Sequence, residues 1–246
     1  MQKNTPMCVE IALRIPGTWS SLQQLKDSLP DCTQLTDAKV SLKDGWECDY
    51  FILPADSEFP RIFRSSCRRI PTREEQKKVS NYTFSVGLSG PGGSLEAAFQ
   101  MMKAASVFIE AGGAGVFIDN SGLAHGGQDW LNMCDMGGTD SISYAFVALI
   151  RGLSEVWTMG FQALGIPDLR MARLDSEQDP DSIIDIIRYM AAAEVRVEHG
   201  HLIADGQGPL FKVLETSCSR FKLGSPMYNP FGYLKLERTR GSVSDN

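Results

Sequence analysis

The sequence predicts an α+β fold: a single domain in which a mixed β-sheet packs against helices, with two similar α/β halves as a variant. Three adjacent patterns predict it. Apolar residues alternate with small or polar ones over Tyr82–Leu88, as in a β-strand. Polar residues recur at helical spacing over Leu95–Ala111 in an otherwise almost wholly apolar stretch, which indicates a helix packed on several sides. Ala114–Ile118 is apolar without alternation, as in a strand covered on both faces, and completes a crossover unit.

Before this unit, alternation and helix signals predict a strand, a helix, a strand and two helical pieces. Their ranges are Cys8–Ile15, the stretch from a cap at Ser20 or Ser21 to Leu29, Trp46–Leu53, and Ser57–Ser80 divided at Pro71. Residues 31–45 give no clear pattern. The basic residues of the helical pieces form either an anion-binding face or a solvated surface; they are Arg61, Arg64, Arg68, Arg69, Arg73, Lys77 and Lys78.

After the unit, the sequence predicts a helix, a hairpin, a second long helix and further strands. The helix is Gln128–Met136, the hairpin pairs Ile142–Ile150 with Glu155–Met159, and the long helix runs from a cap at Asp179 to Gly200. The last strands are Leu202–Ala204, Phe211–Thr216 and Tyr233–Glu237. The domain therefore spans residues 1–237, and residues 238–246 are a frayed tail.

Composition narrows the class of protein. With 246 residues and 43% apolar content, the chain can bury a full core, and its net charge of −6 argues against nucleic-acid or anionic-membrane binding while permitting a basic partner. The six cysteines lack metal or redox spacing. No run of eighteen apolar residues and no signal-peptide pattern occurs. These features predict a soluble cytoplasmic protein.

Two loops have residue patterns associated with chemistry. Gly87–Ser94 has the glycine spacing of a phosphate loop, but Gly93 stands where the lysine is needed, and a glycine-rich turn before a packed helix also explains it. Asp119 and His125 delimit a loop after a buried strand, where a general acid and base could act. Against catalysis, no serine or cysteine sits in a nucleophile elbow, and the loop's start also suits a tight turn.

Two further clusters are weaker candidates. His199 and His201 could hold a metal with Asp205 or Glu198, although histidines at the end of a helix also cap carbonyls. Acidic residues gather before and within the start of the second long helix, where the helix dipole is a sufficient explanation and a basic partner is another. They are Asp175, Glu177, Asp179, Asp181 and Asp185.

Several short motifs spread over most of the chain carry a resemblance. They are Gly113-Ala-Gly-Val-Phe-Ile-Asp-Asn-Ser-Gly-Leu-Ala-His125 followed by Trp130, Ile15-Pro-Gly-Thr-Trp19, Met159-Gly-Phe-Gln-Ala-Leu-Gly-Ile-Pro167 and Asn229-Pro-Phe-Gly232. In these the sequence resembles a bacterial family called domain of unknown function four-two-six-one. That family has no assigned reaction and implies no site residues. The resemblance implies membership of bacterial accessory gene sets, including those that pair secreted toxins with immunity proteins, by analogy only.

The leading hypothesis is a non-catalytic cytoplasmic protein-binding protein, with an immunity protein that inhibits a bacterial secreted toxin as its specific form. Acidic inhibitors associate faster with basic toxins through electrostatic steering, so the acidic cluster is the first candidate binding face. A hydrolase that uses Asp119 and His125 is the alternative. A nucleotide or small-molecule sensor that uses Gly87–Ser94 is a further one. No cofactor, metal, nucleic acid or membrane is predicted as a partner.

Overall fold

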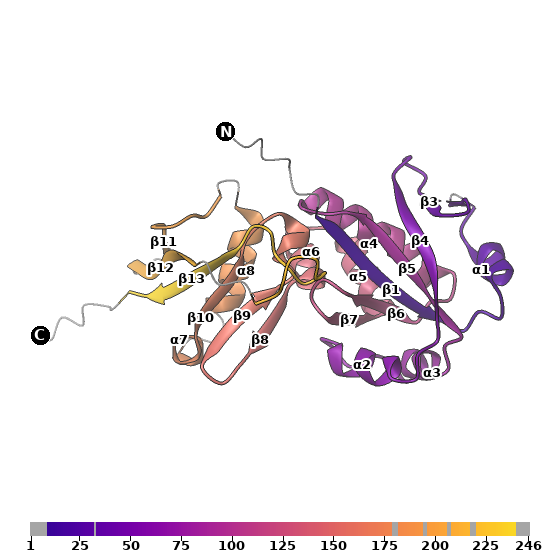
Figure 1. The fold of residues 1–246 in the computed structure, drawn as a ribbon, viewed down its shortest axis with the longest axis horizontal. Helices are drawn as coiled ribbons and strands as arrows, with labels where there is room; N and C mark the ends of the chain where they lie inside the picture. Colours follow the sequence, from indigo (N-terminus) through magenta and orange to yellow (C-terminus); the bar gives the residue numbers. More distant parts are fainter. Residues whose placement is uncertain are drawn as a thin grey trace, which may run out of the picture.

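The fold is α+β, as predicted. The computed structural model describes residues 9–31, 33–178, 182–193, 196–205, 208–216 and 220–239. Two β-sheets lie side by side, with helices behind and between them (Figure 1). The helices are α1 (Leu22–Ser28), α2 (Phe59–Ser66), α3 (Arg73–Ser80), α4 (Leu95–Glu110), α5 (Gly127–Met136), α6 (Thr139–Phe146), α7 (Arg173–Gln178), α8 (Ser182–Ala192) and a short 3-10 helix, η1 (Phe161–Leu164).

The first sheet has seven strands in the order β2-β3-β4-β5-β1-β6-β7, with every neighbouring pair antiparallel. Because β5 and β6 both run antiparallel to β1, they are parallel to each other, and α4 connects them. The predicted strand–helix–strand unit is therefore present, with β1 inserted between its strands. The strands are β1 (Glu10–Gly17), β2 (Gln34–Leu35), β3 (Lys39–Ser41), β4 (Glu47–Pro54), β5 (Phe84–Pro91), β6 (Gly115–Ile118) and β7 (Leu123–Gly126).

The second sheet has six strands in the order β11-β12-β13-β10-β9-β8. The β10–β13 pair is parallel and the other pairs are antiparallel, so this sheet is mixed. Its edge strand β8 and neighbour β9 form the predicted hairpin partners. The strands are β8 (Ala148–Arg151), β9 (Glu155–Met159), β10 (Asp168–Ala172), β11 (Leu202–Asp205), β12 (Gly208–Thr216) and β13 (Tyr233–Arg238).

One continuous hydrophobic core joins the two sheets. It contains Leu13 of β1, Phe108 of α4, Phe146 of α6 and Leu234 of β13, all of them buried. Burying each such side chain contributes roughly 1.5–3 kcal/mol, so the sheets are stabilised by shared packing. A smaller cluster around Phe63 fixes α2 and α3 beneath β6 and β7 (Figure 1).

The predicted strand over Ile142–Ile150 is wrong in its first part, because α6 extends to Phe146 and only β8 is extended. Ile142 and Phe146 lie four residues apart on one buried helical face, and α6 packs against α4, α5 and α8. This packing on several sides outweighs the strand preference of the isoleucine and aromatic residues. Asp140 in the first turn adds a favourable interaction with the helix dipole.

Three predicted boundaries also differ. The loop predicted over Asp119–His125 is a turn followed by β7, because its second half pairs with β6. Gly200 does not end the second long helix: α8 ends at Ala192, and the amide of Gly200 donates to Val213 in the β11–β12 region. β13 extends to Arg238, the first residue of the predicted tail. The predicted cap at Asp179 lies outside the described residues, as do residues 240–246.

Within the described part of the chain, no helix combines the length and the apolar character that crossing a membrane requires.

Candidate functional site

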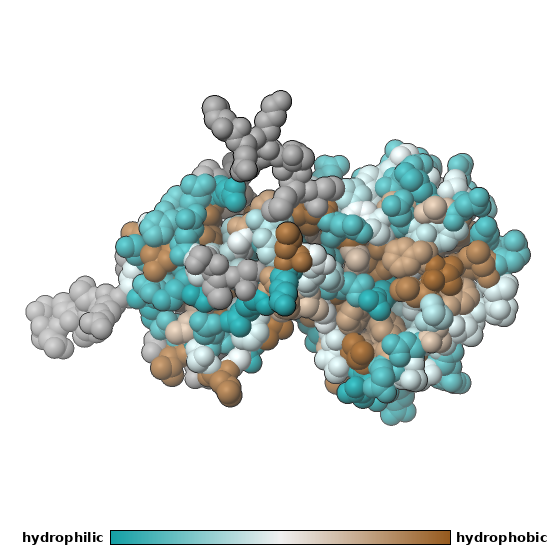
Figure 2. Space-filling view, viewed as in Figure 1, coloured by the Kyte–Doolittle hydropathy of each residue, from teal (hydrophilic) through white to brown (hydrophobic). Residues whose placement is uncertain are grey.

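An open cleft of about 710 Å³ lies where the two halves of the molecule meet. Its walls come from the segment after α2, from α5 and α6, and from β8 and α8. In Figure 2 the lower outline of the molecule is indented between the β8–β9 hairpin and α2. The apolar lining residues are Leu123, Met133, Met136, Val147, Ala148, Leu149, Ile150, Ile184 and Ile187, and the charged ones are Arg68, Arg69, Asp129, Asp140 and Arg188.

Arg68 fastens one wall of the cleft to the C-terminal end of α6. Its guanidinium group donates to the carbonyl of Tyr144 at 2.7 Å and to the carbonyl of Val147, and it lies 4.4 Å from the centre of the Tyr144 ring. Its backbone amide also donates to Ala124 of β7 at 3.2 Å. Burial lowers the pKa of Arg68. Because the C-terminal end of a helix carries partial negative charge, the end of α6 stabilises the positively charged guanidinium group of Arg68.

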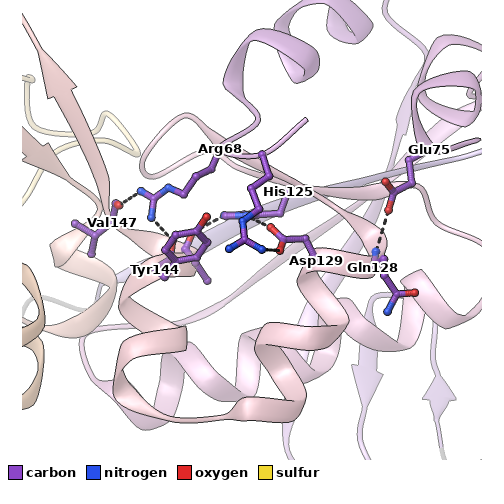
Figure 3. A network of polar contacts seen from close by, with 9 residues as sticks. Arg68, Glu75, His125, Gln128, Asp129, Tyr144 and Val147 are labelled. Atoms are coloured by element: carbon purple, nitrogen blue, oxygen red, sulfur yellow. Dashed lines mark hydrogen bonds and ion pairs between the residues drawn. The ribbon is translucent and has the colours of Figure 1, made fainter. Parts of the chain in front are cut away.

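His125 and Asp129 face each other beside the cleft (Figure 3), and Arg69 contacts the same carboxylate, so the three residues form a second chain of contacts. His125 is fully buried and donates from Nε2 to the carbonyl of Ala145 at 2.9 Å. Its Nδ1 lies 3.5 Å from Oδ2 of Asp129, and the other carboxylate oxygen lies 3.3 Å from Arg69. The pKa of Asp129 is lowered, chiefly by its interaction with His125 and further by the charges of Arg69 and Arg68.

These contacts leave little reactive chemistry in the cleft. The imidazole of His125 is fully buried and its Nε2 donates to the carbonyl of Ala145, so it is not placed to take a proton from a ligand in the cleft. Burial raises the pKa of the Cys67 thiol to about 12, with smaller effects from the Glu75 and Asp129 carboxylates. A thiol with that pKa is protonated at neutral pH and is a poor nucleophile. The network joins the segment after α2 to α5 and to the end of α6 along this wall.

Glu75 positions the helix that carries Asp129. Its carboxylate accepts from the amide of Thr72 at 2.6 Å, completing a capping box on α3, and from the amide of Gln128 at 2.9 Å in the first turn of α5. Gly126, the N-cap residue of α5, has no side chain to do this, and a Cβ there would come within 2.7 Å of Glu75. In the sequence, this capping box is indicated by Thr72 followed three residues later by Glu75.

The structure does not bring Asp119 and His125 together. The carboxylate of Asp119 pairs with Arg14 of β1 at 2.8 Å. His125 lies opposite Val116 in the β6–β7 hairpin, at the end away from the turn that holds Asp119. The neighbouring Asn120 is buried and accepts from the amide of Ala12, so this turn is tied to β1. The partner of His125 is instead Asp129, four residues further along the chain.

The acidic cluster falls on two helices and the segment between them. Asp175 and Glu177 belong to α7 and Asp185 to α8, whereas Asp179 and Asp181 lie outside the described residues. Asp185 is exposed and lies 3.2 Å from Arg188. One of these carboxylates is thus already paired with a cation at the edge of the cleft.

Most of the predicted phosphate loop is a strand, and the two glycine amides that follow the strand are engaged. Residues 84–91 form β5, Gly92 donates to Val9 at 2.8 Å and Gly93 donates to Ala163 at 2.9 Å. The Ser94 hydroxyl caps α4 by accepting from Ala97. A phosphate group needs such amides free, so this segment offers it little.

His199 and His201 serve as acceptors for backbone amides, those of Glu215 at 3.2 Å and Glu198 at 3.0 Å respectively, each through Nδ1. Among the described residues, no three histidine, cysteine, aspartate or glutamate side chains are grouped to hold a metal ion.

Comparisons with models of protein families, with curated proteins and with solved structures found no match for this chain. The function is therefore inferred from the geometry and the residues of the cleft.

Proposed function

We propose that this chain is a non-catalytic binding protein that holds a segment of a protein partner in the cleft between its two sheets. The observation that carries the proposal is that the floor of the cleft is apolar whereas its edges carry charged side chains. Met136 and Ile184 line the cleft and are nevertheless open to solvent, with exposed fractions of 68% and 41%. The side chains of Arg69 and Arg188 are also more than half exposed. Apolar surface of this kind, bordered by polar groups, is typical of interaction sites.

The burial and protonation of the polar groups beside the cleft favour a binding function over a catalytic one. His125 and Cys67 are the residues of the cleft region best suited to proton transfer or nucleophilic attack, but the imidazole is fully buried and the raised pKa keeps the thiol protonated. An immunity protein that covers a toxin is one form of this proposal, supported by the resemblance to the bacterial family and by the net charge of −6. The arginine edges favour acidic residues in the segment that enters the cleft itself.

The experiment selects peptides from a random displayed library on the purified full chain and measures their affinity by fluorescence anisotropy. Met136→Lys and Ile184→Glu should each weaken binding about tenfold or more, because the lost burial of one large apolar side chain is worth roughly 1.5–3 kcal/mol. Leu174→Lys is the matched control, since Leu174 is 72% exposed and lies outside the cleft lining. Selected peptides that bind both cleft variants as tightly as the parent protein would overturn the proposal.

A further inference from the structure

The strand β8 forms one edge of the six-stranded sheet and also one wall of the cleft. Three of its four residues, Ala148, Leu149 and Ile150, line the cleft. Among the described residues it has a strand neighbour on one side, β9. An edge strand presents a row of backbone amides and carbonyls that can pair with another chain.

The pairing register shows which backbone groups face outward. The amide of Gly152 donates to the carbonyl of Glu155 at 2.9 Å, which marks this pair as a hydrogen-bonded position of the hairpin. Hydrogen-bonded pairs alternate along an antiparallel ladder, which makes Ile150–Trp157 the next one. The amides and carbonyls of Leu149 and Arg151 therefore point away from β9.

Arg68 sets the limit of this open edge. The alternation that turns Leu149 and Arg151 outward also turns Val147 outward, and the Val147 carbonyl accepts from the Arg68 guanidinium group. One end of the edge is thus closed by a side chain of the protein itself. The open stretch begins at Leu149, beside the apolar floor of the cleft.

We propose that the partner's segment binds in extended form and adds to β8 as a further strand, pairing with Leu149 and Arg151. This inference rests on the proposed function and specifies how the segment lies. Addition of a strand to a sheet edge takes affinity from backbone hydrogen bonds and specificity from pockets for alternate side chains. Here alternate apolar side chains of the segment face the floor around Met133 and Ile187.

Charge defines the partner further. Arg151 is exposed at the end of β8, whereas the partly exposed Arg69 and Arg188 in the cleft already face carboxylates, those of Asp129 and of Asp140 and Asp185 respectively. A segment that alternates apolar and acidic residues, with an acidic residue beside Arg151, complements both the floor and this exposed cation. A second copy of this chain fits less well, because edge-to-edge pairing would bring two arginine-bearing edges together, and facing like charges destabilise strand pairs.

Amide hydrogen exchange with the tightest selected peptide tests the inference on the full chain. In the free protein, the amides of Leu149 and Arg151 should exchange faster than the amide of Ile150, which pairs with β9. On saturation with the peptide, Leu149 and Arg151 should gain protection of at least about tenfold, and Ile150 should change little. If the cleft variants weaken binding and neither outward amide gains protection, the strand-addition inference is overturned and the proposed function stands. If the cleft variants leave binding unchanged, both are overturned.

Two substitutions separate the backbone contribution from the charge. Arg151→Gln removes the cation and keeps the amide, and should weaken binding a few-fold. Arg151→Pro also removes the outward amide, which an edge strand tolerates, and should weaken binding about tenfold more by leaving a carbonyl of the peptide unpaired. Equal affinities of the two variants would contradict strand addition.

A peptide series covers the case in which the proline variant does not fold. Methylating the peptide's backbone nitrogens one at a time should weaken binding at alternate positions only. The inference would be overturned if methylation weakened binding equally at every position, or if it weakened binding at consecutive positions, as expected for a peptide that binds as a helix. A dimer of the free protein that Arg151→Gln strengthens and that the peptide dissociates would show that a second copy occupies the edge, and would equally overturn it.

Discussion

The amide of Asn229 donates a hydrogen bond of 2.8 Å to Oδ2 of Asp168, a carboxyl group that is fully buried in the second sheet. Thr158 donates to the other carboxyl oxygen at 3.0 Å. Burial raises the pKa of Asp168 to about 7, and the hydrogen bonds from Asn229, Thr158 and the amide of Phe161 oppose that rise. This group makes stability depend on pH.

Asp168 should destabilise the fold as pH rises from about 4 to about 7. The unfolded carboxyl ionises near pH 4 whereas the folded one keeps its proton until near pH 7, so unfolding releases a proton over this window at up to about 1.4 kcal/mol per pH unit. Asp168→Asn does not ionise. Urea unfolding at about pH 5 and about pH 7.5 should show the variant gaining stability relative to the parent at the higher pH. A difference that is the same at both pH values would contradict this assignment.

Glu75→Ala should lower the free energy of unfolding by about 1–2 kcal/mol, because it removes side-chain acceptors from the first turns of both α3 and α5. Glu75→Gln keeps one acceptor oxygen and should cost less. Gly126→Ala tests the contact directly, because its new methyl group meets the Glu75 carboxylate. In a double-mutant cycle followed by urea unfolding, Gly126→Ala should cost less in the Glu75→Ala background, and additive effects would contradict the contact.

Asp129→Asn should have opposite effects on stability and binding. It removes the charge that faces His125 and Arg69, so the protein should be less stable. Because the pKa of Asp129 is lowered in the folded state, this stabilisation is present above about pH 4 and disappears as pH falls through the folded-state pKa. The released Arg69 should bind a selected acidic peptide about threefold more tightly, measured by anisotropy. Weaker binding by a folded Asp129→Asn protein would show that Asp129 itself contacts the peptide.

Cys67 should react slowly with iodoacetamide despite its partial exposure. A thiol pKa of about 12 leaves very little thiolate at pH 8, so alkylation in the folded protein should be at least about a hundredfold slower than in urea. Mass spectrometry of the peptide that contains Cys67 gives both rates. Comparable rates in the two conditions would refute the buried, protonated thiol.

The elements that the sequence predicts well are those whose signal is local. The periodicity of residues 95–110 defines α4 because one helix carries the whole pattern, and the capping serine at position 94 is adjacent. Residues 142–146 form a helix instead of a strand because α6 is packed against α4, α5 and α8, and that information lies far away in sequence.

The candidate site shows the same division. The sequence points to His125 by its place after a buried strand and pairs it with Asp119, but its neighbour Asp129 lies on the next helix, and Asp119 pairs with Arg14 of β1. Arg68 and Arg69 were visible only as part of a basic segment. What distinguishes them is that Cys67 pairs with Ala124 of β7, a contact between distant parts of the chain that no spacing in the sequence indicates.

The position of β1 has a consequence for synthesis of the protein. β1 pairs with Phe84–Pro91 on one side and with residues 117 and 118 on the other, so both neighbours leave the ribosome long after it does. Its two hydrogen-bonding edges are not both paired until the crossover unit is complete, and forming such distant contacts is slow. The nascent chain is thus most vulnerable to aggregation before the second of these neighbours emerges, and a chaperone that shields β1 would act in that interval.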